Sequence, residues 1–240
     1  MDFISLLNEL FEFWWFILLL LIFGILKTPW FKGFYGESIV RFGTKINLPS
    51  EIYNTIHNVT LPTLDGTTQI DHIVVSPFGI FVVETKNMTG WIFGGEKQTQ
   101  WTQQIFKHSY KFQNPLRQNY KHVKALQAVL DVSSSTIFSV VVFVGNSTFK
   151  TPMPPNVTYG GGYIRYIKSF NEPILSESEV QSVVAKIQSW RLEKTREIKR
   201  KHIQQLKTRS DPSAIRKCPK CRSDMVLRTA KKGVNAGKQF

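Results

Sequence analysis

The fold is decided by residues 66–87, which read GTTQIDHIVVSPFGIFVVETKN. Two runs rich in β-branched residues, 68–76 and 80–87, flank a Pro-Phe-Gly turn, and this pattern favours two antiparallel strands. Residues 51–61 form a similar run, separated from the first by the turn signal Leu-Asp-Gly-Thr. We therefore predict an antiparallel meander of three strands.

Further segments complete the predicted core. Apolar side chains recur at helical spacing in residues 36–48 and 115–130, and residues 136–145 read as a buried strand. Short aromatic segments at 91–93 and 101–102 are expected to extend the sheet or to cap its edge. The predicted order is α-β-β-β-α-β, which is an α/β core with a mixed sheet.

Two carboxylates and one lysine stand in the apolar meander: Asp71, Glu84 and Lys86. Because strand side chains alternate, Glu84 and Lys86 share one face, and a tight turn can place Asp71 beside them. Carboxylate oxygens bind Mg²⁺, the metal neutralises phosphate and activates water, and a lysine can stabilise the developing charge. The set fits phosphodiester hydrolysis, and ordinary polar residues on half-exposed strands are the alternative.

These residues also carry a family resemblance. Asp71, followed thirteen residues later by Glu84-Thr85-Lys86 on this element order, resembles the PD-(D/E)xK, or restriction-endonuclease-like, superfamily. Residues 66–87, together with the Gly36-Glu37 pair, the Gly90-Trp91 pair and the run NPLRQNYKHVKAL at 114–126, resemble the nuclease-related domain (NERD) family over roughly residues 33–145.

The resemblance implies a role for each candidate site residue. Asp71 and Glu84 would be ligands of Mg²⁺ or Mn²⁺, Lys86 would be the catalytic lysine, and Glu37 and Gln118 would line the site. The chain departs from the superfamily pattern at one position, because Ile70 stands where a proline usually precedes the aspartate.

Other chemistries find little support in the sequence. The five histidines show no metal-ligand spacing, and His72 is expected to point away from Asp71. No Gly-x-Ser-x-Gly nucleophile elbow occurs. The sequence therefore favours a metal-dependent mechanism over one based on histidine or serine.

The N-terminal segment is strongly apolar. Residues 13–26 read FWWFILLLLIFGIL, and tryptophans near both ends suit the two membrane interfaces. Acidic residues precede this run and Lys27 and Lys32 follow it, so the positive-inside rule favours a cytoplasmic position for the rest of the chain. We expect residues 1–32 to form a single-pass anchor in the inner membrane; a buried or interfacial helix and a signal peptide are the alternatives.

Positive charge gathers near the C-terminus. The chain has a formal net charge of +14, and residues 186–240 hold seventeen Lys and Arg against four Asp and Glu. Such a segment suits nucleic acid or an anionic membrane surface, and a solvated basic helix is the alternative. A long helix is expected from Ser176 to Lys207, opened by a capping box between Ser176 and Glu179.

The chain has two cysteines, Cys218 and Cys221, in the sequence CPKC. The pair favours a reducing compartment and resembles the first half of the four-cysteine zinc ribbon appended to some DNA topoisomerases. A tetrahedral Zn²⁺ site needs a second pair, which is absent before Phe240. We therefore expect either a truncated sequence or a half-site that another chain completes.

Four parts are thus predicted: an anchor with its flank at 1–32, a nuclease-related domain at 33–175, a basic helical segment at 176–210 and an incomplete zinc-ribbon tail at 211–240. The predicted function is that of a membrane-anchored, metal-dependent nuclease that hydrolyses phosphodiester bonds in DNA. The alternative is a catalytically silent scaffold that keeps the fold and binds nucleic acid or the membrane.

Overall fold

The main sheet contains the predicted meander. The computed structural model describes residues 14–63, 66–130, 132–192, 200, 216–217 and 223–225. Its main sheet has the order β1-β2-β3-β7-β9, in which β1, β2 and β3 are antiparallel, β7 is parallel to β3, and β9 is parallel to β7. The strands are β1 (Asn54–Thr63), β2 (Gly66–Ser76), β3 (Gly79–Asn87), β7 (Ile137–Val144) and β9 (Val157–Tyr159). The predicted meander and the mixed α/β core are confirmed.

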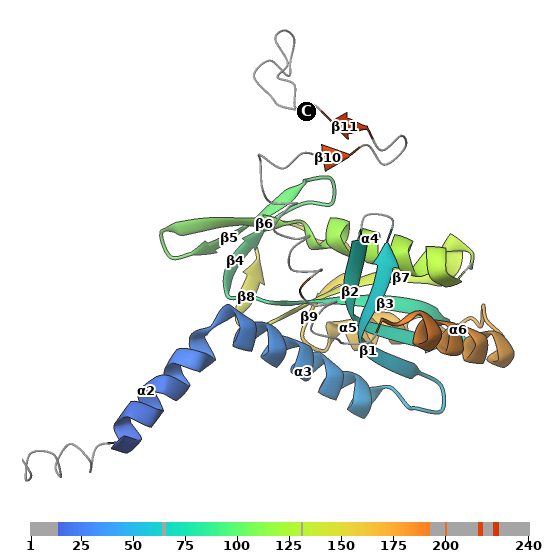
Figure 1. Cartoon of the computed structure of the whole chain (residues 1–240), viewed down its shortest axis with the longest axis horizontal. Helices are drawn as coiled ribbons and strands as arrows, with labels where there is room; N and C mark the ends of the chain where they lie inside the picture. The colour runs from blue at the N-terminus through green and yellow to red at the C-terminus, as the bar shows by residue number, and fades with distance from the viewer. Residues whose placement is uncertain are drawn as a thin grey trace, which may run out of the picture.

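Helices cover both faces of this sheet (Figure 1). The helices are α3 (Pro29–Asn47) and α5 (Gly162–Lys168) on one face, and α4 (Pro115–Leu130) and α6 (Glu177–Trp190) on the other. Alternation along β3 explains the two layers, since Val82 packs with Leu126 of α4 whereas Val83 packs with Val40 of α3. A short 3-10 helix, Ser134–Thr136, leads into β7.

A second sheet differs from the expectation for the aromatic segments. Residues 91–93 and 101–102 do not join the main sheet; they belong to a separate sheet of order β6-β5-β4-β8. Its strands are β4 (Gly90–Phe93), β5 (Gln100–Ile105), β6 (His108–Gln113) and β8 (Ser147–Phe149). The reason is packing: fully buried Trp101 stacks on Phe143 of β7, which gives this sheet its own apolar layer.

The helix predicted for residues 36–48 is longer than expected, and it meets a preceding helix at a bend. α3 begins at Pro29 rather than at residue 36, because Thr28 caps its first turn by accepting a hydrogen bond from Phe31 N. α2 (Trp14–Lys27) precedes it and buries no side chain. Among the described helices none could cross a bilayer alone by length and apolarity; α2 and α3 meet that criterion together, with a bend of 69° between them. The anchor expected in residues 1–32 stays a prediction.

α6 is shorter than the helix expected for residues 176–207. The predicted capping box of Ser176 and Glu179 is confirmed, but the helix ends at Trp190. The chain leaves the helix because Leu192 N donates a hydrogen bond to Thr60 O of β1, at 2.9 Å. Apolar side chains of α6 such as Val183 pack in the main core, so the folded body continues beyond the predicted boundary at residue 175.

From residue 193 onward, the predicted basic and zinc-ribbon segments lie outside the described residues except at 200, 216–217 and 223–225. Two short strands there, β10 (Arg216–Lys217) and β11 (Asp224–Met225), pair antiparallel. Cys218 and Cys221 also lie outside the described residues. The proposed zinc half-site therefore stays a prediction.

Candidate active site

The candidate site lies where β2 and β3 separate. The ladder between these strands runs from Ser76↔Gly79 to His72↔Val83, so Asp71 and Glu84 would form the next pair. Instead, Thr85 N donates a hydrogen bond to Asp71 Oδ2, at 2.8 Å. The Asp71 side-chain oxygen thus replaces a backbone carbonyl as the acceptor for Thr85 N. The Asp71 and Glu84 side chains lie together where the two strands separate.

Three side chains are joined by short hydrogen bonds at this point. Lys86 Nζ donates to Glu84 Oε1 and to Gln118 Oε1, each at 2.8 Å. Gln118 Nε2 donates in turn to Glu84 Oε1, at 2.7 Å. Gln118 comes from the first turns of α4, so the helix and β3 together hold the lysine beside the carboxylate. The structure therefore brings together Asp71, Glu84, Lys86 and Gln118.

His122 is a neighbour that the sequence did not reveal. Its Nε2 lies 3.2 Å from Glu84 Oε2, and its Nδ1 shares a hydrogen bond with Thr68 Oγ1, at 2.8 Å. Although these two atoms are close, neither His122 Nε2 nor Glu84 Oε2 makes a well-oriented hydrogen bond, so Glu84 keeps one buried oxygen unsatisfied. The only signal in the sequence is that His122 follows Gln118 by one helical turn.

The two carboxyl groups have opposite electrostatic environments. Burial raises the pKa of Asp71 well above its ordinary value, and the nearby Glu84 and Glu37 carboxylates raise it further. Burial alone would also raise the pKa of Glu84, but Lys86 and His122 outweigh it and hold that pKa below the usual range. Without a cation, Glu84 is therefore the ionised member of the pair and Asp71 resists ionisation.

Glu37 approaches from the opposite face of the sheet. It belongs to α3, and its charge reaches Asp71. When the Asn58 amide is oriented to satisfy both neighbours, its nitrogen donates to Glu37 Oε2 and its oxygen accepts from Arg41, each at 2.9 Å. Asn58 has a φ of 54°, which turns it out of the β1 ladder opposite Asp71. Glu37 thus adds negative charge near Asp71 from the α3 side.

Two histidines of neighbouring strands contact each other next to Asp71. His72 follows Asp71 and contacts His57 of β1, with their Nδ1 atoms 2.8 Å apart. Burial, together with the nearby Arg41, lowers the pKa of His57 to about 4 and that of His72 to about 3. Both rings are therefore neutral at physiological pH, and neither contributes positive charge to the site.

The donor chemistry of the site fits a divalent cation. Asp71 and Glu84 offer carboxylate oxygens, one of them buried and without a hydrogen bond, and ionisation of Asp71 is opposed by acidic neighbours. Mg²⁺ is commonly held by one or two carboxylates and keeps several waters. Within the part of the chain that the structure describes, no three His, Cys, Asp or Glu side chains are already gathered as a metal cage. Two carboxylates therefore fit a hydrated Mg²⁺ ion.

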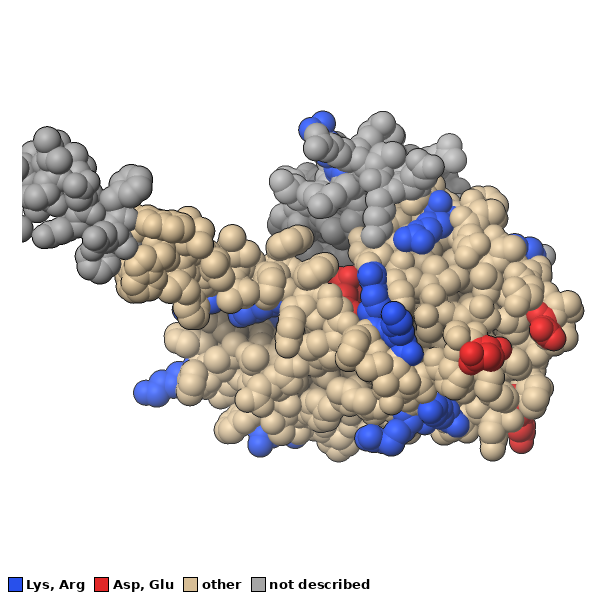
Figure 2. Space-filling model, turned by 90° about the horizontal axis from the view of Figure 1, so that it is seen from below, with Lys and Arg blue, Asp and Glu red and all other residues tan. Residues whose placement is uncertain are grey.

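Surface charge is not concentrated around one point. On the face drawn in Figure 2, Lys and Arg side chains stand at several separate places, whereas most of the visible Asp and Glu side chains lie toward the end remote from α2. Within residues 88–150, which include the second sheet and α4, seven Lys and Arg stand against two Asp and Glu. The segment that contains the second sheet and α4 is therefore basic in composition.

Comparisons with known proteins identify relatives of this chain. Residues 32–144 match the family described as "Nuclease-related domain" (NERD). The chain is also 38% identical over 185 residues to an uncharacterized protein of Bacillus anthracis, a match that covers 75% of this chain and 85% of that protein. No solved structure matches the chain.

Proposed function

Because the chain belongs to the nuclease-related domain family, we propose that it is a divalent-metal-dependent nuclease that hydrolyses phosphodiester bonds in DNA. One observation carries the proposal: Lys86 is held 2.8 Å from Glu84, beside a second acid, where β2 and β3 separate. A cation and two carboxylates at one point suit the negative phosphate group and the water that attacks it.

Asp71 and Glu84 are the residues that would hold the metal, and Mg²⁺ or Mn²⁺ suits their oxygen donors. When bound, the ion supplies charge neutralisation at the phosphate and activation of water. It would also lower the pKa of Asp71, because a cation favours the ionised carboxylate that burial and Glu84 oppose. His122 Nε2 lies 3.2 Å from Glu84 Oε2 and helps to keep Glu84 ionised.

Lys86 is the proposed catalytic lysine. Its side chain is 20% exposed, so Lys86 can reach a phosphate oxygen or the attacking water while Glu84 and Gln118 fix its position. Preorganised positive charge of this kind stabilises the additional negative charge of the transition state. Gln118 acts through Lys86 and Glu84, as it bonds to both, and Glu37 adds negative charge from the α3 side.

The experiment is a DNA cleavage assay with the full chain in nonionic detergent. We expect cleavage with Mg²⁺ or Mn²⁺ and none in excess chelator. Titration with Mn²⁺, followed by electron paramagnetic resonance, should show weaker binding to Glu84→Gln than to wild type. The exposed Glu172 supplies a matched control, Glu172→Gln, that should bind the metal like wild type. Cleavage that is equal with and without chelator would contradict the proposal.

Attachment to the inner face of a membrane is a separate part of the proposal. The support is α2, an uncharged run up to Lys27 in which no side chain is buried. Its aromatic and aliphatic side chains would be unfavourable in water, and basic residues follow rather than precede it. Membrane fractionation tests this: the full chain should resist carbonate extraction, and deletion of residues 1–32 should release it.

A further inference from the structure

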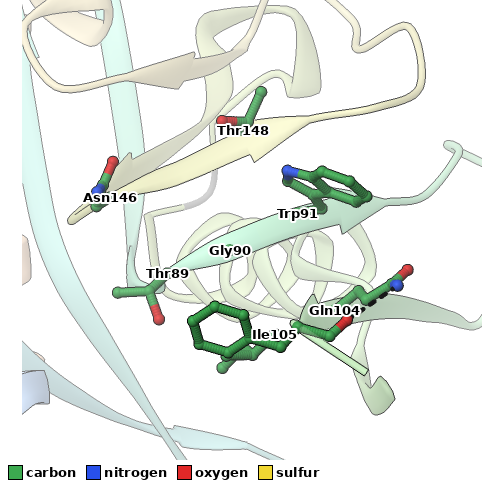
Figure 3. A pocket seen from close by; sticks show the side chains of 8 residues that line it. Thr89, Gly90, Trp91, Gln104, Ile105, Asn146 and Thr148 are labelled. Atoms are coloured by element: carbon green, nitrogen blue, oxygen red, sulfur yellow. Dashed lines mark hydrogen bonds between the residues drawn. The ribbon is translucent and has the colours of Figure 1, made fainter. Parts of the chain in front are cut away.

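The outer face of the second sheet carries an exposed indole ring with a lysine over it. Trp91 of β4 is 49% exposed, and Lys150 Nζ lies 4.5 Å from its ring centroid. Strand register places Thr148 of β8 and Gln104 of β5 directly beside Trp91. Figure 3 shows the ring between these two polar neighbours. Ile92, the next residue, points inward and is fully buried, so the outward position of Trp91 follows from strand alternation.

A cleft of about 580 Å³ adjoins this ring. It is lined by Trp91, by Gln104 and by Phe106, which forms the β5–β6 turn with a φ of 52° and is 93% exposed. Positive φ is rare for a bulky residue, so the turn projects an aromatic ring that the core does not use. The cleft thus offers flat apolar groups beside polar ones, and Lys150 lies over the Trp91 ring.

We propose that this face binds an unpaired stretch of DNA, with Trp91 stacked on a base and Lys150 beside its phosphate. The inference rests on the proposed nuclease function and specifies its substrate. Aromatic platforms in a positive groove are the features by which proteins hold single strands. Lys150, over the Trp91 ring, and Lys111, which bonds to Thr102 on the same face of β5 as Gln104, favour a polyanion over a neutral or cationic partner.

An unpaired stretch fits better than a duplex. Bases in a duplex are already stacked on their neighbours, so an indole ring on an open sheet face can stack only on a base that is free of its neighbours. Moreover, this sheet offers the flat outer surface of four strands rather than a helix or a ribbon of the shape that enters the major groove.

The proposed surface is connected to the candidate active site by one continuous stretch of backbone. Glu84 and Lys86 lie on β3, and Trp91 lies on β4 only five residues after Lys86. Met88 N donates to Val144 O and Gly90 N donates to Asn146 O, so pairing with the neighbouring segment continues between the two strands. Seven residues span at most about 25 Å, so a strand stacked on Trp91 can extend to Glu84.

The test is fluorescence anisotropy of a labelled oligothymidylate and of a mixed-sequence duplex of equal length, with the full chain in detergent and excess chelator to prevent cleavage. Since stacking contributes about 1–3 kcal/mol per base, Trp91→Ala should weaken single-strand binding about tenfold or more and duplex binding much less. Trp91→Phe should recover part of the loss. Lys150→Ala should reduce the salt dependence of binding by about one phosphate contact.

Trp190 provides a matched control, because it is 51% exposed at the end of α6, away from the second sheet. Trp190→Ala should bind the oligothymidylate like wild type. Unchanged single-strand binding by Trp91→Ala, or an equal loss for single strand and duplex, would overturn the inference. If wild type cleaves DNA with Mg²⁺ in either of those cases, the proposed function stands and only the surface is wrong. If Trp91-dependent binding is found without cleavage, the surface is supported and the nuclease function fails.

Discussion

Replacing Lys86 with alanine should destabilise the fold by about 2 kcal/mol, because a hydrogen bond to a charged group contributes about 1.5–3 kcal/mol. The ammonium donates to Glu84 Oε1 and Gln118 Oε1 at 2.8 Å, and the Glu84 side chain is only 3% exposed. Two features keep the loss from being larger. Gln118 Nε2 still bonds to Glu84 at 2.7 Å, and the 20% exposure of Lys86 lets water replace the lost group.

The loss should depend on pH with a defined sign. The folded-state pKa of Glu84 lies below its unfolded value, because Lys86 and His122 outweigh the effect of burial. The stabilisation is therefore complete above the unfolded pKa of about 4.3 and disappears as pH falls through the folded pKa. The difference between wild type and Lys86→Ala should accordingly shrink when the pH is lowered from about 7 to below about 4.

Urea unfolding at several pH values measures this difference. The control is Lys111→Ala, since Lys111 is exposed and bonds to Thr102 on the protein surface; its effect should be about 0.5 kcal/mol or less. If Lys86→Ala is as stable as the control at neutral pH, or if its deficit does not change with pH, the lysine does not interact with an ionised, buried Glu84, and the site geometry is wrong.

Three further substitutions or conditions test the site and its surroundings. Asp71→Asn should raise the free energy of unfolding of the metal-free protein by about 1 kcal/mol, measured in urea, because the amide removes a carboxylate that burial and Glu84 disfavour. Mg²⁺ should then raise the urea midpoint of the variant less than that of wild type. The free energy of unfolding should fall as pH drops below about 6.5, because the unfolded chain then binds protons at His57 and His72. The folded chain does not, since its pKa values are about 4 for His57 and about 3 for His72. Urea unfolding of His57→Gln at several pH values should show a smaller pH slope. Asn119→Ala should lower stability by about 2 kcal/mol in a urea titration, because the buried amide donates to backbone carbonyls of both β3 and β7; a change below about 0.5 kcal/mol would contradict that bridging role.

The register that forms the site was accessible from the sequence. A tight Pro-Phe-Gly turn fixes how β2 pairs with β3, and counting outward from Ser76↔Gly79 places Asp71 opposite Glu84. Strand alternation then puts Lys86 on the same face as Glu84. The sequence could not show that the ladder stops one pair earlier, at His72↔Val83, or that Asp71 Oδ2 accepts a hydrogen bond from Thr85 N. Both features depend on how the neighbouring layers separate the two strands.

Contacts from the helices were harder to predict. Gln118 and His122 share one face of α4, but only the position of α4 over β3 shows that both reach Glu84. The end of α6 has a similar cause: the charged sequence after Trp190 would suit a longer helix, and the contact of Leu192 with Thr60 is tertiary. Segments with strong local signals, such as the meander, were predictable, whereas elements decided by packing between layers were not.

The most direct measurement of the central claim is the single-turnover rate of DNA cleavage by Glu84→Gln beside that of the exposed control Glu172→Gln, both with saturating Mg²⁺. Loss of a metal-directed carboxylate removes several kcal/mol of transition-state stabilisation, so Glu84→Gln should be at least about a hundredfold slower than wild type. Glu172→Gln should cleave at the wild-type rate, since its side chain is exposed and distant in sequence from the site. Wild-type cleavage by Glu84→Gln would contradict the assignment of the Asp71–Glu84–Lys86 site as the catalytic centre.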